Sequence, residues 1–118
     1  MRIMDVDTVA PGERHGLTDR LLEGEAVHEA FRASNTAVLF TERRILLIQR
    51  HTLLTERVET SSYPYRAIRH FSVLEGQPEE SRSEIKIWLG SDAQPLHLRA
   101  LGTADFAPLQ RLLAEKLG

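Results

Sequence analysis

The stretch YPYRAIRHFSV (residues 63–73) decides the fold, and it lies near the middle of the chain between two runs that are typical of β-strands. Pro64 has no backbone N–H and a fixed φ, so it does not fit inside a central strand, whereas Ile68 and Phe71 favour burial. The stretch therefore predicts a corner, in which one strand ends at about Ser62, the chain turns tightly, and another strand starts near Ile68. A β-sheet that bends back at such a corner can close over its own core.

Short strands account for most of the chain on either side of this corner. Seven runs have the composition or the apolar alternation of strands: residues 26–31, 36–40, 44–50, 52–62, 68–73, 84–89 and 96–101. The third run contains ILLI at residues 45–48, and four consecutive aliphatic residues favour burial on both faces of a strand. The last two runs alternate polar with apolar residues, which predicts one face in the core.

The remaining segments predict two helices and a loose N-terminus. Residues 1–12 are mixed in character and end in a Pro-Gly break, so we expect loose structure there. The leucines within residues 17–22 have the spacing of one face of a short helix. Phe106 and the leucines that follow it predict an amphipathic C-terminal helix over residues 105–117, with Asp105 as its N-cap.

The length of 118 residues predicts a single domain, residues 1–118, that can bury a core. The 15 basic and 17 acidic residues give a net charge of −2, which argues against a nucleic-acid binder. The absence of cysteine excludes disulfides, thiolate nucleophiles and zinc–thiolate sites, and it fits a reducing compartment. Because there is no secretory signal and no apolar run near the roughly 18 residues of a membrane-spanning helix, we expect a cytoplasmic protein.

The order of these elements is that of pleckstrin-homology-like folds: mainly β with α, a partly open antiparallel barrel of about seven strands capped by a C-terminal helix. Five short pieces carry the resemblance further: LEGEAV (22–27), FTERR (40–44), PYRAI (64–68), FSV (71–73) and EIKIW (84–88). In joint order and spacing, from about Leu22 to Leu117, they resemble the bacterial pleckstrin-homology domain family. The chain departs from that family in the turn after Arg50, where glycine is usual and residues 51–54 (HTLL) contain none. A positive φ would be costly for Thr or Leu, so the resemblance does not predict the conformation of this turn.

The resemblance implies assembly rather than chemistry. It implies a closed cyclic homo-oligomer, with a pentamer as the expected ring, in which neighbouring protomers join through sheet edges. It implies no reaction and no cofactor. The leading hypothesis is therefore a non-enzymatic module that self-assembles and presents a polar surface, formed where protomers meet, to a protein partner. The alternative is a peripheral binder of lipid headgroups or another anionic ligand, which would need basic residues gathered on one face.

The candidate interaction surface is the densest set of basic residues expected at loops and strand ends. Its members are Arg43, Arg44, Arg66, Arg69 and His70. Such a set could hold phosphate or a partner's acidic motif. The favoured interpretation is that these are solvated charges, paired with Glu42, Glu56 or Glu59.

Other functional sites have weaker support in the sequence. The loop of the first strand pair offers only Arg32 to an anionic headgroup, so we do not expect a phosphoinositide or membrane-lipid site. The five histidines lack metal-ligand spacing, and His70 and Ser72 would point to opposite faces of a strand, so they cannot form a nucleophile–base pair. We therefore expect no metal, cofactor or catalytic site. Trp88 could face either the core or a recognition surface.

Overall fold

The computed structural model describes residues 3–14, 16–76, 82–101 and 104–117, and this part of the chain forms eight strands, three 3-10 turns and one α-helix. The strands are β1 (Ile3–Thr8), β2 (Val27–Arg32), β3 (Thr36–Thr41), β4 (Arg44–His51), β5 (Arg57–Pro64), β6 (Ile68–Leu74), β7 (Glu84–Leu89) and β8 (Leu96–Ala100). The 3-10 turns are η1 (Pro11–Glu13), η2 (Thr18–Arg20) and η3 (Tyr65–Ala67), and the helix is α1 (Ala107–Leu117). Seven strands correspond to the predicted runs, and β1 is additional.

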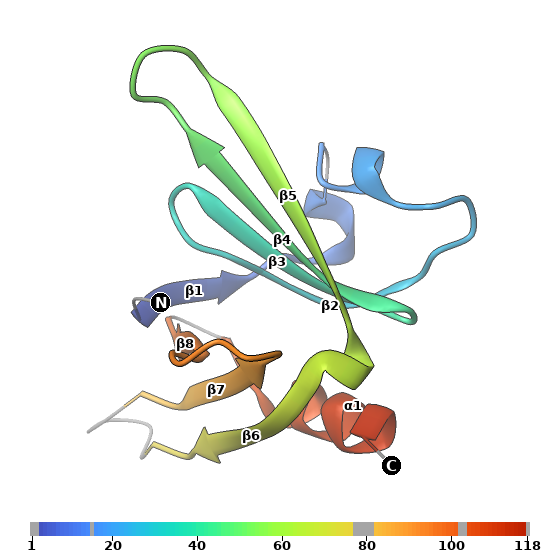
Figure 1. Ribbon diagram of the computed structural model, residues 1–118, viewed down its shortest axis with the longest axis vertical. Coiled ribbons are helices and arrows are strands. Elements are labelled where there is room, and N and C mark those ends of the chain that lie inside the picture. The colour runs from blue at the N-terminus through green and yellow to red at the C-terminus, as the bar shows by residue number, and fades with distance from the viewer. Residues whose placement is uncertain (1–2, 15, 77–81, 102–103, 118) are drawn as a thin grey trace.

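The strands form one sheet in the order β5-β4-β3-β2-β1-β8-β7-β6, which folds over itself into two layers (Figure 1). Strands β2 to β5 make one layer and β6 to β8 the other, while β1 joins them by pairing antiparallel with β2 and parallel with β8. Although β5 and β6 are consecutive in the chain, they lie at opposite ends of this order. The barrel is therefore open between them. The predicted fold class is confirmed, except that the β1–β8 pair is parallel.

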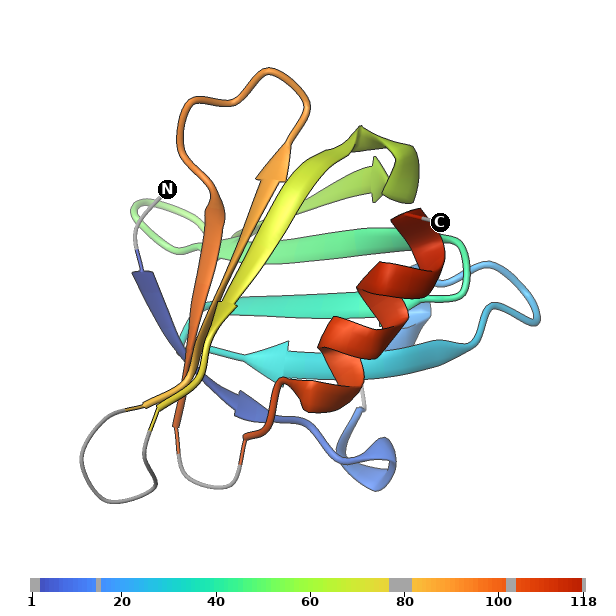
Figure 2. The same cartoon turned by 90° about the horizontal axis from the view of Figure 1, so that it is seen from below.

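The main core lies between the two layers. Phe31 packs against Phe40 and Phe106, with ring centroids 6.1 and 5.4 Å apart. Helix α1 lies across the opening between the layers (Figure 2) and buries Leu109 and Leu113 completely. Its apolar stripe therefore closes the core, as expected of an amphipathic helix.

The C-terminal helix begins two residues later than predicted, at Ala107. Asp105 lies just before it, and its carboxylate accepts a hydrogen bond from the backbone N–H of Ala107 at 3.0 Å. This bond satisfies a donor that no helical carbonyl can reach, which is the capping role predicted for Asp105.

Strand β4 is buried on both faces, as its four aliphatic residues predict. Ile45 and Leu47 contribute to the main core, whereas Leu46 and Ile48 contribute to a second cluster on the opposite face of the β2–β5 layer. The members of this second core are Val9, Ala30, Ala37, Leu39, Leu46 and Ile48. The segment between β1 and β2 covers it, because Leu17 and Leu21 pack against these residues.

The prediction of a loose N-terminus over residues 1–12 is wrong for the described part. Residues 3–8 form β1, whose register places Ile3 opposite His97 and Val6 opposite Ala100. Val6 is only 1% exposed. Pairing with β2 and β8 and the burial of Val6 stabilise the strand. The mixed composition of the segment indicates neither of these features.

The short helix predicted from the leucines of residues 17–22 is also wrong. Residues 17–22 contain only the single 3-10 turn η2 instead, and Gly24 has a φ of 77°. Leu17 and Leu21 still face the same way, since both pack on the second core, whereas Leu22 is 54% exposed. An irregular chain lying on a sheet thus gives the two leucines the burial that a helix would have given them.

The corner at residues 63–73 is confirmed. Strand β5 runs to Pro64, two residues beyond the predicted end, and Pro64 is tolerated because β5 is an edge strand. The turn η3 follows, and β6 begins at Ile68, which is buried. Phe71 is half-buried against the main core.

The fourth strand begins later than predicted, at Arg57 rather than at residue 52. Residues 52–56 connect β4 to β5 at the tip of the longest hairpin (Figure 1). Among the described residues, positive φ angles occur only at glycines. The tip therefore turns without the glycine that is usual in related sequences, by using five residues outside the strands.

Candidate functional site

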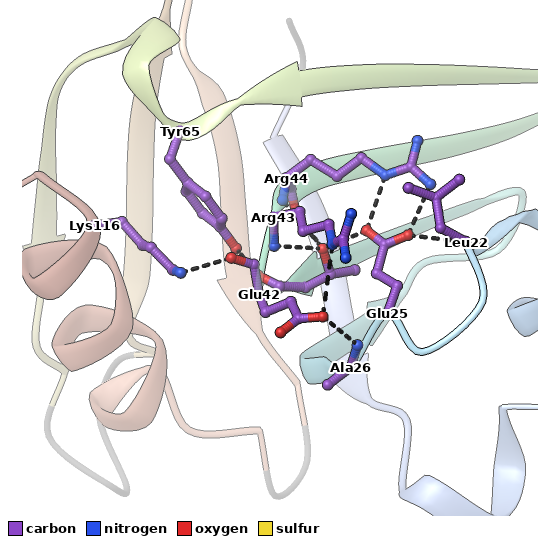
Figure 3. A network of polar contacts seen from close by, with 9 residues as sticks. Leu22, Glu25, Ala26, Glu42, Arg43, Arg44, Tyr65 and Lys116 are labelled. Atoms are coloured by element: carbon purple, nitrogen blue, oxygen red, sulfur yellow. Dashed lines mark hydrogen bonds and ion pairs between the residues drawn. The ribbon is translucent and has the colours of Figure 1, made fainter.

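A buried carboxylate lies beside the β3–β4 turn (Figure 3). Both oxygens of Glu25 accept hydrogen bonds from Arg44: Nε donates to Oε2 and Nη2 to Oε1, each at 2.9 Å. The hydroxyl of Thr41 donates to Oε2 at 2.7 Å, and the backbone N–H of Leu22 donates to Oε1 at 2.9 Å. The Glu25 side chain has no exposed surface, so this ion pair is enclosed by the fold.

The electrostatics of the pair follow from this geometry. The hydrogen bonds from Arg44 lower the pKa of Glu25 to about 2, against the opposing effect of burial, and the carboxylate in turn raises the pKa of Arg44. Arg44 also donates to the Ser62 hydroxyl at 2.9 Å and to the Arg20 carbonyl at 3.1 Å. Arg44 therefore joins three segments of the protein and has little capacity left for a ligand.

A second set of contacts fixes the corner against the helix. The Tyr65 hydroxyl donates to the carbonyl of Thr41 at 2.5 Å, and burial raises the pKa of Tyr65. Lys116 of α1 donates to the carbonyl of Glu42 at 2.6 Å, and its Nζ lies 5.3 Å from the centroid of the Tyr65 ring (Figure 3). These polar groups are paired with one another, so the cluster stabilises the fold and offers no free reacting group.

The predicted basic residues have no partner in common among the contacts of the described chain. Arg43 lies 3.7 Å from the Glu42 carboxylate, as the solvated-charge interpretation predicts, but Arg44 pairs with Glu25 instead. Arg69 donates to the carbonyl of Asp92 at 2.6 Å. The two other expected acids, Glu56 and Glu59, pair with Arg50 and His51 and with no member of the set within the described chain. Arg66 is exposed in η3. The role of these residues in an interaction surface stays a prediction.

His70 and Trp88 form an aromatic stack on the outer face of β6 and β7. Their ring centroids are 4.1 Å apart and the ring planes differ by 18°. The neighbours of Trp88 on β7, Ile87 and Leu89, are buried in the main core. Trp88 therefore points away from the core, and the outer surface of this layer carries an aromatic pair in which Trp88 is half-buried and His70 is exposed.

A pocket of about 310 Å³ opens on the other layer, on the face that carries the second core. Its polar lining consists of Arg20, Arg32, Ser34, Asn35, Thr36 and Arg50. We call this site the arginine pocket. Arg20 comes from η2, Arg32 from the end of β2, and Arg50 from the end of β4, so three separate elements supply the arginines.

Sequence reasoning found only one of these three arginines. It considered only the basic residues around the β2–β3 loop, where Arg32 is the last residue of β2. The hairpin register was a usable signal for Arg50, because pairing Thr36 with Gln49 places Arg50 next to the loop, and its N–H donates to the Asn35 carbonyl at 2.8 Å. Arg20 could not be found in this way, since its position depends on how the irregular segment lies on the sheet.

Two other kinds of site find no support in the described part of the chain. No group of three or more His, Asp or Glu side chains is gathered there as metal ligands would be. The described helix is also too short to cross a membrane.

Comparison with known proteins agrees with this fold. The family described as the bacterial PH domain matches residues 6–117, and the chain belongs to that family. Over 75 residues it is 35% identical to the uncharacterized protein YjqA of Bacillus subtilis (strain 168), and this alignment covers 64% of the chain and 60% of YjqA. The chain therefore matches less than two thirds of that relative.

Two solved structures share nearly the whole architecture. One is a protein with a pleckstrin-homology domain from Shewanella loihica PV-4, which is 24% identical to this chain. Its superposition has a TM-score of 0.76 and covers 96% of this chain and 97% of the Shewanella chain. The other is a pleckstrin homology domain from Shewanella amazonensis SB2B, which is 26% identical with a TM-score of 0.68 and covers 92% and 98%. The resemblance found in the sequence is thereby confirmed.

Proposed function

We propose that the protein is a non-enzymatic PH-like module that assembles into a cyclic homo-oligomer in the cytoplasm and presents a surface to a protein partner. One observation supports assembly above all others. The sheet ends in two edge strands, β5 and β6, and no other described strand pairs with their outer sides. Unpaired backbone groups along an edge are a template for pairing with another chain.

The geometry of the edges favours a ring. Strand β5 has eight residues and β6 has seven, so each edge is long enough for a full ladder of hydrogen bonds. The two edges differ in sequence, and a contact between β5 of one protomer and β6 of the next would be head-to-tail. Head-to-tail contacts form closed rings when the rotation closes. The expectation of five protomers rests on the family resemblance.

The predicted basic residues have a place in this arrangement. Arg69 and His70 lie on the β6 edge strand, and Arg66 lies in the turn that connects the two edges. Side chains at these positions would flank a junction between protomers. A partner bearing acidic groups would fit them. We leave Arg44 out of this proposed surface because its guanidinium pairs with Glu25.

Light scattering coupled to size exclusion tests the assembly directly. We expect a mass that is a multiple of the 13.4 kDa chain at micromolar concentration, with five copies as the expected ring. A monomer at that concentration and above would contradict the proposal.

A pair of proline variants tests whether the β5 edge is used. Successive residues of an antiparallel edge strand alternately direct their N–H groups toward the neighbouring strand and away from it. Glu59→Pro and Thr60→Pro therefore remove one N–H of each kind, and both residues are exposed. We expect the variant that removes the outward N–H to be a folded monomer. The other variant loses a β4–β5 hydrogen bond and serves as the matched control for stability. An unchanged oligomer in both variants would exclude this edge from the interface.

A further inference from the structure

We propose that the arginine pocket binds a phosphate-bearing anion, held by Arg20, Arg32 and Arg50. This inference does not depend on the proposed assembly, because every group in the pocket comes from one protomer. It also differs from the candidate interaction surface, with which the pocket shares no residue.

The charge of the lining is the first argument. Three arginines line the pocket, and no aspartate or glutamate is among its lining residues. Guanidinium groups match the geometry of phosphate oxygens and can each donate two parallel hydrogen bonds. Three of them around one concave site favour a ligand with more than one negative charge.

The orientation of Arg20 is the second argument. Its Nη1 donates to the carbonyl of Gly16 at 2.8 Å and its Nε donates to the hydroxyl of Thr60 at 3.2 Å. Both acceptors are neutral oxygens, so these bonds position the guanidinium without cancelling its charge. A side chain already held in place loses less entropy on binding a ligand.

The nearest carboxylates are weak competitors. Arg32 also lines a neighbouring pocket with Asp5, Asp7 and Glu13, and its Nη2 donates to the Glu13 carbonyl at 3.5 Å. Within the described chain, however, neither Arg32 nor Arg20 forms an ion pair with a carboxylate. Glu56 lies 3.0 Å from Nε of Arg50, but both side chains are about 60% exposed. Exposed ion pairs of this kind contribute little free energy. A doubly charged phosphate can therefore displace Glu56.

The shape of the pocket suits a small ligand. Its volume of about 310 Å³ lies at the lower end of the range for ligand sites. The lining includes four apolar residues and the polar residues Ser34 and Asn35; the apolar ones are Leu17, Ala37, Ile48 and Val58. Apolar surface next to the guanidinium groups lowers the local dielectric and strengthens their attraction for an anion.

The phosphate could belong to a free metabolite or to a lipid headgroup, and the β4–β5 hairpin offers a way to tell them apart. Arg50 lies opposite Val58 in the register, and both line the pocket. Beyond them the hairpin ends in Leu53 and Leu54, each 93% exposed. A membrane source would engage these leucines together with the pocket, whereas a free phosphate would not.

The test uses the full chain and two probes: sodium pyrophosphate in calorimetric titrations, and sedimentation with phosphatidylglycerol vesicles against phosphatidylcholine vesicles. The pocket variants are Arg20→Gln and Arg50→Gln. The matched control is Arg57→Gln, which removes the same charge from the same hairpin at an exposed position outside the pocket. The double variant Leu53→Ser/Leu54→Ser reports on the hairpin tip.

For a free-phosphate source, we expect pyrophosphate to bind the wild type, and each pocket variant to weaken the affinity by about tenfold or more while Arg57→Gln keeps it. For a lipid source, we expect vesicle binding that Arg50→Gln and the leucine double variant both reduce. Arg50 is exposed, so its replacement leaves the fold intact even if Arg20→Gln destabilises it. Binding of neither probe, or an equal loss in Arg57→Gln, would overturn the proposal.

Discussion

Arginine has opposite roles on the same face of the β2–β5 layer. Arg44 donates hydrogen bonds from Nε and Nη2 to Glu25, whose side chain has no exposed surface. In the arginine pocket, Arg20 is held by neutral oxygens, and the carboxylate nearest Arg50 is exposed. The partner of an arginine, rather than its position in a basic stretch of sequence, therefore decides whether its charge stabilises the fold or is available to a ligand.

The largest expected effect comes from breaking the buried Glu25–Arg44 ion pair. Replacing Arg44 with Met removes the cation and leaves the Glu25 carboxylate buried without its partner. We expect the free energy of unfolding to fall by about 3 kcal/mol or more, since an uncompensated buried charge is costly. Urea unfolding measures the change. Arg43→Met is the control, because the Arg43–Glu42 pair is exposed and long, and a similar loss in that variant would contradict the distinction.

The pH dependence of stability is the next largest effect. Glu25 has a pKa of about 2 in the folded protein and an ordinary value of 4.5, so the unfolded chain binds more protons between these two values. The stabilisation is therefore present above pH 4.5 and is lost as the pH falls through 2, to a total of about 3 kcal/mol. Urea unfolding at several pH values should show a shallower slope in this window for Glu25→Gln. Equal slopes would mean that Glu25 is not the group responsible.

The corner contributes a smaller effect. Tyr65→Phe removes the hydroxyl that donates to the buried Thr41 carbonyl while keeping the ring that Lys116 approaches. We expect a loss of about 1 to 2 kcal/mol, because the carbonyl loses a donor and has little access to water. Thermal unfolding measures this change. Tyr63→Phe is the matched control at the other side of Pro64, where the described chain shows no hydrogen bond from the phenol.

The smallest effect on stability is expected at the arginine pocket. Arg50→Gln removes one exposed ion pair, with Glu56, and we expect a change below about 0.5 kcal/mol in urea unfolding. A loss as large as that of Arg44→Met would show that the pocket arginines are structural as well.

Much of the fold could be predicted because its signals are local. Pro64 marks the corner, the aliphatic run at residues 45–48 marks a strand between two cores, and Asp105 marks the start of the last helix. Strand β1 could not be predicted, because its parallel partner β8 lies at the other end of the sequence and only Val6 is buried in it.

The candidate site was less accessible to sequence reasoning. Leu17 and Leu21 have helical spacing, yet the segment is irregular because a sheet face already satisfies both side chains. The same segment carries Arg20 to the pocket. Basic residues close in sequence, such as Arg43 and Arg44, have unrelated partners, and the three pocket arginines are far apart in the chain. Local density of charge therefore could not identify the pocket.

The decisive experiment is thermal unfolding of the wild type and of Arg50→Gln, each with and without sodium pyrophosphate. It tests whether the arginines of the pocket, unlike Arg44, are available to a ligand. A ligand that binds only the folded state raises the Tm, and the rise grows with the logarithm of the ligand concentration divided by Kd. Without pyrophosphate, we predict Tm values for the two proteins that differ by no more than about 2 °C. Adding it should raise the Tm of the wild type, and this rise should be largely lost in Arg50→Gln. A Tm of Arg50→Gln that is lower by much more than this without the ligand, or a rise of the same size in both proteins, would contradict the prediction.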